Sequence, residues 1–400
     1  MAGFRDLPAE LIIHIASLSV REIILDPDNC LTWNSHREPE LVPDLPSINS
    51  LSQTSIALHR AFNPALYYLC TRVEVLGRLA LLFAVQHQLD TAFDRFIAEG
   101  IDPNSEYNFK SCRCTLIHIA ATLGHRAMVI KLLGKDEEEK RMTAYARACP
   151  DPATALDYAA RQRHMDVVQL LAPVLPPAIP RDIPPPGPLQ PVPVQTHTQY
   201  LSFALTEAVA SQDPEICVYL ISEGADVNFL ADVPPVKPPL FYAIHMNNLA
   251  LVQLLLASGA DPNRYNPYIL FMAADGGNLD MIRVLIQAGA DVHVRNDQLC
   301  NVLTCCTDVE VLRFFLERGV DPNNGDIEGD TVLHSACGER RFLYGNECVE
   351  LLCRFGAMPD KTNDVGQTAL DLALANQLQD IVKIMEPFVH DPDVRAKIAE

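Results

Sequence analysis

The sequence is poor in positive charge. Of its 400 residues, 31 are Lys or Arg against 51 Asp or Glu, which gives a formal net charge of −20 and an isoelectric point near 4.9. Nucleic acids and anionic membrane surfaces bind proteins through concentrated Lys and Arg, so this balance excludes them as the main partners. Hydrophobic residues make up 48% of the chain, so most of it is expected to fold, as two or three domains or as one elongated array.

Targeting and metal signals are also missing. The first residues, MAGFRDLPAE, lack the pattern of a secretory signal, and no Asn-x-Ser/Thr glycosylation site occurs. The 12 cysteines are scattered, which predicts free thiols in a reducing cytoplasmic or nuclear compartment. Cys112 and Cys114, with His118 and His125 downstream, lack two ligand pairs at zinc-finger spacing, so no metal and no cofactor are expected.

No long apolar run is free of polar interruption. The longest stretch without formal charge, residues 238–260, has His245, Asn247 and Asn248 near its middle. It therefore predicts two short buried helices joined by a polar turn rather than one helix that spans a membrane.

What the sequence does contain is a repeated phrase: an apolar helix end, then Gly, a small or apolar residue, Asp, Pro or Val, and Asn. It reads ISEGADVN at Gly224 and LASGADPN at Gly259, and the last five copies are spaced 35, 30, 30 and 37 residues apart. Such a period indicates an array of repeats. Glycine ends each helix because it adopts the left-handed conformation without a Cβ clash. These structural turn glycines are Gly100, Gly224, Gly259, Gly289, Gly319 and Gly356.

A second phrase begins the first helix of each repeat. It reads TLIHIAA at Thr115, TALDYAA at Thr154, TVLHSAC at Thr331 and TALDLAL at Thr368. Threonine caps the helix, and small residues let the neighbouring helix approach. A polar turn and a second helix with an apolar stripe follow, such as LDMIRVLIQAG, so each repeat is predicted to be helix-turn-helix.

Together these phrases resemble the ankyrin repeat. The resemblance covers nine repeats from about Leu79 to Phe388 and implies an all-α solenoid of helix pairs with β-turn fingers. Three repeats depart from the pattern: the third lacks its Gly, the seventh has a first helix shorter by about three residues, and the eighth carries the insertion GERRFLYGNE.

The first 75 residues show a different pattern. LPAELIIHI at 7–15 and FNPALYYLC at 62–70 resemble the two halves of an F-box, separated here by an irregular insertion at 26–43. The combination with ankyrin repeats is abundant in filamentous fungi. The resemblance implies a small helical module whose apolar face docks on the Skp adaptor of an SCF-type cullin–RING ubiquitin ligase. The residues expected to bind the adaptor are Leu7, Pro8, Leu11, Ile12 and Ile15.

The repeats are interrupted by a proline-rich segment, with 10 prolines between Pro173 and Pro193. Such composition favours an extended linker and could divide the array into three and six repeats. The expected domains are listed in order: the F-box-like module at 1–75, repeats 1–3 at 79–172, the linker at 173–198, repeats 4–9 at 199–388 and a tail at 389–400.

No nucleotide-binding loop, nucleophile elbow or metalloprotease motif occurs, so the chain is not expected to be an enzyme. The resemblance gives His118 and His334 structural hydrogen bonds, and it places partner binding at finger tips and at the ends of first helices. The candidate residues are Arg161, Gln162, His245, Met246, Arg264, Tyr265, Asp275, Asn296, Asp297, Ile327, Glu328 and Asp364.

The leading hypothesis is a non-catalytic substrate receptor, monomeric outside its ligase complex, whose array binds a target protein. One alternative is an ankyrin scaffold or inhibitor in which the F-box-like segment is only a cap on the array. Another is an accessory protein of a metabolic enzyme complex.

Overall fold

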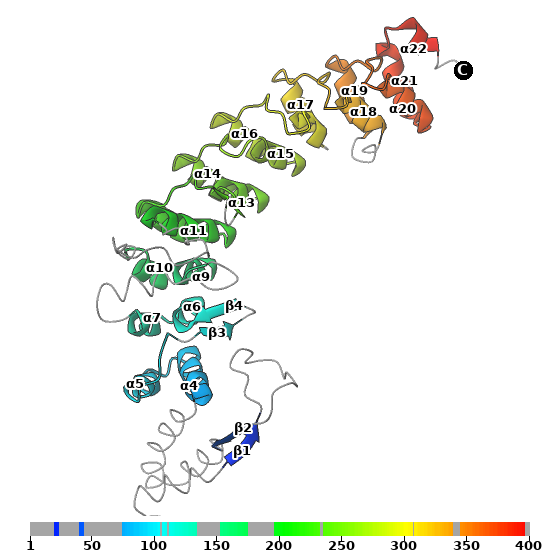
Figure 1. The fold of residues 1–400 in the computed structure, drawn as a ribbon. Coiled ribbons are helices and arrows are strands. Elements are labelled where there is room, and N and C mark those ends of the chain that lie inside the picture. Colours follow the sequence, from blue (N-terminus) through cyan, green and yellow to red (C-terminus); the bar gives the residue numbers. More distant parts are fainter. Residues whose placement is uncertain are drawn as a thin grey trace, which may run out of the picture. The chain divides into compact units, whose positions relative to one another are not determined.

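The computed structural model describes residues 20–23, 40–43, 74–104, 106–109, 112–133, 153–174, 196–232, 235–306, 308–338 and 345–396. The chain forms two compact parts, Met1–Ala225 and Asp226–Glu400. Within each part, pairs of short helices follow one another in chain order (Figure 1). None of the helices in the described ranges is long and apolar enough to cross a membrane.

The first part contains the first four repeats. Their helix pairs are α4 (Glu74–Gln86) with α5 (Asp90–Ala98), α6 (Leu116–Thr122) with α7 (Arg126–Leu132), α9 (Ala155–Arg161) with α10 (Met165–Leu171), and α11 (His197–Ala210) with α12 (Pro214–Ser222). The first helices pack in the order α4, α6, α9 and α11. Two antiparallel hairpins complete this part: β1 (Val20–Ile23) with β2 (Glu40–Pro43), and β3 (Glu106–Phe109) with β4 (Cys112–Thr115).

The second part contains repeats five to nine. Its helix pairs are α13 (Pro239–His245) with α14 (Leu249–Ala257), α15 (Tyr268–Asp275) with α16 (Leu279–Gln287), η2 (Val302–Cys305) with α17 (Val309–Leu316), α18 (Val332–Cys337) with α19 (Asn346–Arg354), and α20 (Ala369–Ala375) with α21 (Gln379–Met385). The first helices again pack on one another in chain order. The short hairpin of β5 (Ala231–Asp232) and β6 (Pro235–Val236) precedes α13, and η3 (Glu386–Phe388) and α22 (Pro392–Ala396) follow α21.

The caps predicted from the sequence are present at the ends of these helices. Thr115, Thr154, Thr331 and Thr368 each begin a first helix in a capping box, with His or Asp three residues later as the reciprocal partner. All six turn glycines lie at positive φ, for example +103° at Gly224. Local sequence therefore defines both ends of the repeated unit.

The core lies between successive helix pairs. Small residues of the first helices, such as Ala120 and Ala160, are completely buried, so neighbouring first helices approach closely. Leucine, valine and isoleucine on the second helices, such as Leu171 and Leu285, fill the other side of each layer. Each repeat therefore covers its apolar faces with its neighbours, which is the basis of stability in repeat proteins.

Several features differ from the sequence expectations. The fold is mostly helical but not all-α, because fingers such as β3–β4 extend into hairpins. In the seventh repeat the shortened first helix is the 3₁₀-helix η2. Glu40–Pro43, at the end of the segment expected to be irregular, is a strand. The segment expected to be a tail contains the short helix α22. Just before this helix, the backbone N–H groups of His390 and Asp391 both donate to Asp360 Oδ2, at 2.8 and 3.0 Å.

Candidate functional site

The finger tips of repeats six to eight share one turn. In each, the side-chain oxygen of the first tip residue accepts the N–H of the residue four positions later: Asn296 from Cys300 at 2.9 Å, Asp326 from Asp330 at 2.9 Å, and Asn363 from Gln367 at 2.9 Å. The fourth position is left-handed, at Leu299, Gly329 and Gly366. Asn and Asp favour this type of turn because they replace backbone acceptors.

Backbone hydrogen bonds join the three tips. The N–H of Ile327 donates to Gln298 O at 3.0 Å, and the N–H of Asp364 donates to Glu328 O at 3.0 Å. Asn363 Nδ2 also donates to Asp330 Oδ1 at 2.7 Å. The three tips therefore form one row held in register rather than three independent loops.

This row has both acidic and apolar side chains. The predicted residues Asp297, Ile327, Glu328 and Asp364 are all exposed. Sequence reasoning missed Leu299 and Val365, which are 46% and 77% exposed beside an Ile327 that is 58% exposed. We call this set the tip ridge: Asp297, Leu299, Ile327, Glu328, Asp364 and Val365. Asn296, predicted to contact a partner, instead uses its side-chain oxygen to hold the turn.

An aromatic cluster borders the tip ridge at the start of α15. Tyr265 lies edge-on to Phe241, with ring centroids 5.6 Å apart, and stacks on Tyr268 at 5.0 Å. Lys237 lies over the Tyr265 ring, 4.6 Å from its centroid, and donates to its hydroxyl. The Tyr268 hydroxyl donates to Asp297 Oδ2 at 3.3 Å, which connects the cluster to the first tip of the ridge.

The charges in this cluster affect one another. The negative charge of Asp297 is the main cause that raises the pKa of Tyr268. The hydrogen bond to Tyr265 is the main cause that raises the pKa of Lys237. Both groups therefore keep their protons at neutral pH. Of the cluster, only Tyr265 was among the predicted site residues; Lys237 and Phe241 contact it from the preceding repeat, and Tyr268 contacts it from three residues further along the chain.

The remaining predicted residues in the second part lie at the ends of first helices or, for Arg264, in the finger before α15. His245, Met246, Arg264 and Asp275 are exposed, and the His245 ring stacks on Phe241 at 6.3 Å. Met246 is 40% exposed. These residues extend from α13 to the end of α15, on the same two repeats as the aromatic cluster.

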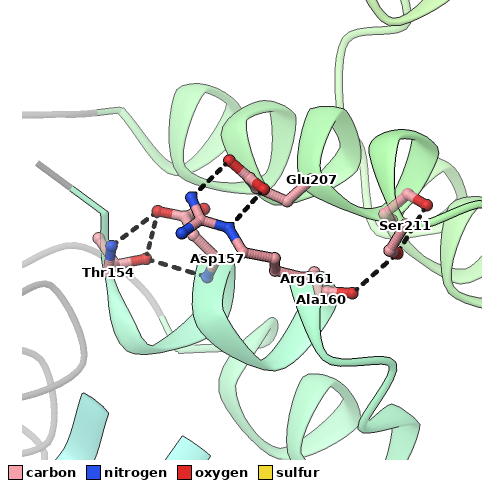
Figure 2. A network of polar contacts seen from close by, with 7 residues as sticks. Thr154, Asp157, Ala160, Arg161, Glu207 and Ser211 are labelled. Carbon is pink, nitrogen blue, oxygen red and sulfur yellow. Dashed lines mark hydrogen bonds and ion pairs between the residues drawn. The ribbon is translucent and has the colours of Figure 1, made fainter. Parts of the chain in front are cut away.

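Gln162 and Arg161 belong to the first part of the chain. Gln162 is exposed, whereas Arg161 is engaged within the array. Its guanidinium lies 5.3 Å from the centroid of the Tyr158 ring and pairs with Glu207 on α11, with Nε–Oε2 at 2.8 Å and Nη2–Oε1 at 2.9 Å (Figure 2). The guanidinium of Arg161, a residue predicted to bind a partner, thus joins α9 to α11.

The buried carboxyl of Asp157 lies in the same network. Its Oδ2 accepts from the N–H and hydroxyl of Thr154 at 2.7 and 2.9 Å (Figure 2), while Oδ1 has no hydrogen-bond partner among the residues that the structure describes. Burial raises the pKa of Asp157 to about 7, and Glu207 adds to this rise while the Thr154 hydrogen bonds oppose it. The carboxyl takes part in the capping box that begins α9.

The histidines considered for chemistry hold the repeats together. His118 and His334 accept hydrogen bonds at Nδ1 from the threonine that caps their helix. His334 Nε2 also donates to Gln367 O of the next repeat at 3.1 Å, as predicted for a structural histidine. His125 Nε2 donates to Gln86 O at 3.1 Å. Within the described ranges, no three His, Cys, Asp or Glu side chains gather in a way that could hold a metal ion.

The geometry defines a class: a helical repeat protein with projecting finger tips and exposed aromatic and acidic side chains. The family model for ankyrin repeats (three copies) matches residues 55–176, 204–296 and 301–396. The chain belongs to the ankyrin-repeat family. Ankyrin repeats bind other proteins, and the fold is typically a non-enzymatic interaction scaffold. The first matched range begins at residue 55, inside the segment that resembles an F-box.

Solved ankyrin structures resemble parts of the chain. An ankyrin repeat domain from Acinetobacter baumannii AYE is 24% identical, with 46% of this chain and 97% of that one covered and a TM-score of 0.42. The ankyrin repeat domain of Bcl-3, described as a unique member of the IkappaB protein family, is 23% identical, with 60% of this chain and 97% of that one covered and a TM-score of 0.45. A comparison with curated proteins finds no match.

Proposed function

We propose that this chain is a non-catalytic substrate receptor of an SCF-type ubiquitin ligase. The N-terminal segment docks on the Skp adaptor, and the ankyrin array binds the target protein. The observation that carries this proposal is the sequence LPAELIIHI at 7–15 with FNPALYYLC at 62–70, ahead of an ankyrin array. Leu7, Pro8, Leu11, Ile12 and Ile15 lie outside the described residues, so their role rests on the motif.

The insertion between the two motif halves is compatible with this proposal. β1 and β2 pair antiparallel, with Val20 opposite Pro43 and Ile23 opposite Glu40. The chain therefore leaves and returns at adjacent points, and the intervening residues need not separate the segments on either side of the hairpin.

The target-binding side of the proposal rests on the tip ridge and the aromatic cluster. Both are presented by repeats whose tips are fixed by hydrogen bonds, and a fixed surface loses little conformational entropy when it binds a partner. Other ligase subunits would transfer ubiquitin, so this chain contributes positioning alone.

A pull-down with purified Skp adaptor tests the proposal directly. Wild-type chain should capture the adaptor, whereas Ile12→Asp and the double variant Leu7→Ala/Pro8→Ala should not, because a buried charge or a truncated apolar face removes helix-in-groove docking. Ile130→Asp is a matched control, since this α7 side chain is 46% exposed and the same exchange should leave capture intact. Equal capture by all four proteins, or by none, would contradict the adaptor role.

A scaffold or inhibitor with a capped array is the second candidate. Two observations favour it: the ankyrin match begins at residue 55, and Phe83 on α4 is 54% exposed in the first described helix pair. Terminal repeats need a cover for such apolar groups. In this case, deletion of residues 1–70 would reduce solubility but leave the affinity of the array for its partner unchanged, and the wild-type chain would not capture the adaptor.

A further inference from the structure

We propose that the tip ridge, with Tyr268 beside it, is a docking surface for a protein segment that carries basic side chains next to apolar ones. This inference rests on the proposed function, because it assigns the chemistry of the partner that the array binds. It comes from two observations on the second part of the chain, exposed apolar side chains and carboxylates without ion-pair partners, and from the way the first part of the chain binds the guanidinium of Arg161.

The apolar side chains of the ridge have no role in the core. Leu299, Ile327 and Val365 are 46%, 58% and 77% exposed, yet they lie on consecutive tips that backbone hydrogen bonds hold together. Single exposed apolar residues are ordinary, whereas a contiguous row of them marks an interaction surface. Tyr268, 45% exposed, extends this apolar surface to the start of α15.

The carboxylates between them lack internal cations. Within the described ranges, ion pairs form at Lys131, Arg161, Arg313 and Arg354, and none of them includes Asp297, Glu328 or Asp364. The cations nearest in sequence to the tips are used on backbone oxygens. Arg295 donates to Leu299 O and Gly325 O, and Lys361 donates to Asn323 O. The ridge therefore keeps its negative charge for a partner.

The negative charge of the tip ridge determines which kind of partner segment can bind there. Carboxylates repel phosphate groups and acidic peptides, and they attract lysine and arginine, which raises the association rate of a basic partner. The apolar side chains between them supply the surface that is dehydrated on binding. A segment with only one of the two properties would leave either the carboxylates or the apolar row uncovered.

The chain itself shows how Tyr268 and Asp297 can hold a cation. Arg161 is bound between the face of Tyr158, 5.3 Å away, and the carboxylate of Glu207 at 2.8 Å. Tyr268 and Asp297 present the same two groups, a tyrosine ring and a carboxylate joined at 3.3 Å, at the first tip of the ridge. An arginine of the partner would stack on the ring and pair with Asp297.

Selection from an unbiased displayed library of 15-residue peptides on the immobilised full chain tests this inference. The ridge variant Ile327→Ser/Val365→Ser removes apolar surface without changing charge. A second variant, Asp297→Asn/Glu328→Gln/Asp364→Asn, removes three charges. Its matched control is Asp280→Asn/Glu317→Gln/Asp380→Asn, which removes three exposed charges from second helices. Unchanged circular dichroism and melting temperature will show that all variants are folded.

We expect the enriched peptides to combine Lys or Arg with apolar residues. Both ridge variants should bind them at least ~10-fold more weakly, the control should bind them as the wild type does, and added salt should weaken binding. Enriched peptides that are acidic or uncharged would overturn the proposed chemistry. Equal loss in the ridge and control variants would show nonspecific attraction instead. Adaptor capture is measured on a different segment, so it separates failure of this inference from failure of the proposed function.

Discussion

Arg161 on α9 and Glu207 on α11 form a two-bond ion pair between the third and fourth repeats (Figure 2). The two residues are 46 positions apart, and the proline-rich segment lies between them in sequence. Ser211 Oγ also donates to Ala160 O at 3.2 Å across the same interface. Because α9 packs on α11, and α10 on α12, the array continues past the proline-rich segment and is not divided into three and six repeats.

A double-mutant cycle on this pair should show modest coupling. Arg161→Ala and Glu207→Ala should each destabilise the chain, and the double variant should be less destabilised than the sum by about 0.5–1 kcal/mol, because both side chains are partly exposed. Urea unfolding followed by circular dichroism measures the four proteins. Strictly additive effects would show that the pair makes no net contribution to the interface.

Replacement of Asp157 should change how stability depends on pH. The folded pKa of this carboxyl is about 7, above the reference value of 3.8, so folding favours its protonated form. Its contribution to stability is complete below pH 3.8 and is lost as the pH rises through 7. Asp157→Asn keeps an oxygen for Thr154 without a titrating group. The variant should therefore gain stability relative to wild type between pH 4 and 7.5, by about 2–4 kcal/mol at roughly 1.4 kcal/mol per pH unit.

Hydrogen exchange of the α9 amides, measured across that pH range, tests this expectation. Asp371 occupies the same position in the capping box of α20 as Asp157 does in that of α9. Asp371→Asn therefore serves as the comparison variant. Parallel pH profiles for the wild type and Asp157→Asn would contradict the raised pKa of Asp157.

The sequence predicts features that depend on neighbouring residues. The turn glycines, the threonine caps, the two helices within 238–260 and the short seventh repeat all follow from local rules, and the structure contains each of them. The motif positions of Asp297, Ile327, Glu328 and Asp364 likewise indicated exposed tips, because the finger follows its Gly at a nearly fixed distance.

Relationships between repeats could not be predicted in this way. Tyr268 pairs with Asp297 and Arg161 with Glu207 only because stacking brings residues 29 and 46 positions apart together. Adjacent polar residues of a tip serve two roles, as Asn296 and Asp297 show: Asn296 holds the turn, and the side chain of Asp297 is exposed. A pattern that assigns whole tips to partner binding cannot separate these roles.

The buried thiols should react slowly in the native protein. Burial raises the pKa of Cys217, Cys337 and Cys353 to about 12, so at pH 8 about 10⁻⁴ of each is thiolate. Cys300 and Cys305 are partly exposed. Peptide mapping after a pulse of N-ethylmaleimide should show Cys300 and Cys305 modified before Cys217, Cys337 and Cys353. The three buried cysteines should be modified only after urea is added, and their rapid labelling in native protein would contradict the buried positions.

A row of asparagines links the fingers in the second part, and it has one gap. Asn263 Nδ2 donates to Gly289 O at 2.9 Å, and its Oδ1 accepts from Asp291 N at 3.0 Å. Asn228 and Asn323 make the same two bonds to the repeats that follow them. His293 occupies this position in the sixth repeat, and among the described residues its side chain makes neither bond to Gly319 or Asp321.

His293→Asn should therefore stabilise the contact between repeats six and seven, by about 1 kcal/mol, because Gly319 O and Asp321 N–H would gain the side-chain partner that Asn supplies at the other fingers. Asn263→Ala should destabilise the contact between repeats five and six by about 1–2 kcal/mol, because both side-chain bonds to Gly289 and Asp291 are removed. His293→Ala should leave the stability of the contact between repeats six and seven nearly unchanged. Hydrogen exchange of peptides from 290–320 resolves this local effect, which global unfolding of a repeat array would average. If His293→Asn leaves these amides no better protected than His293→Ala does, the fingers are held by the tip-to-tip bonds at Gln298 and Glu328 and the asparagine row adds nothing there.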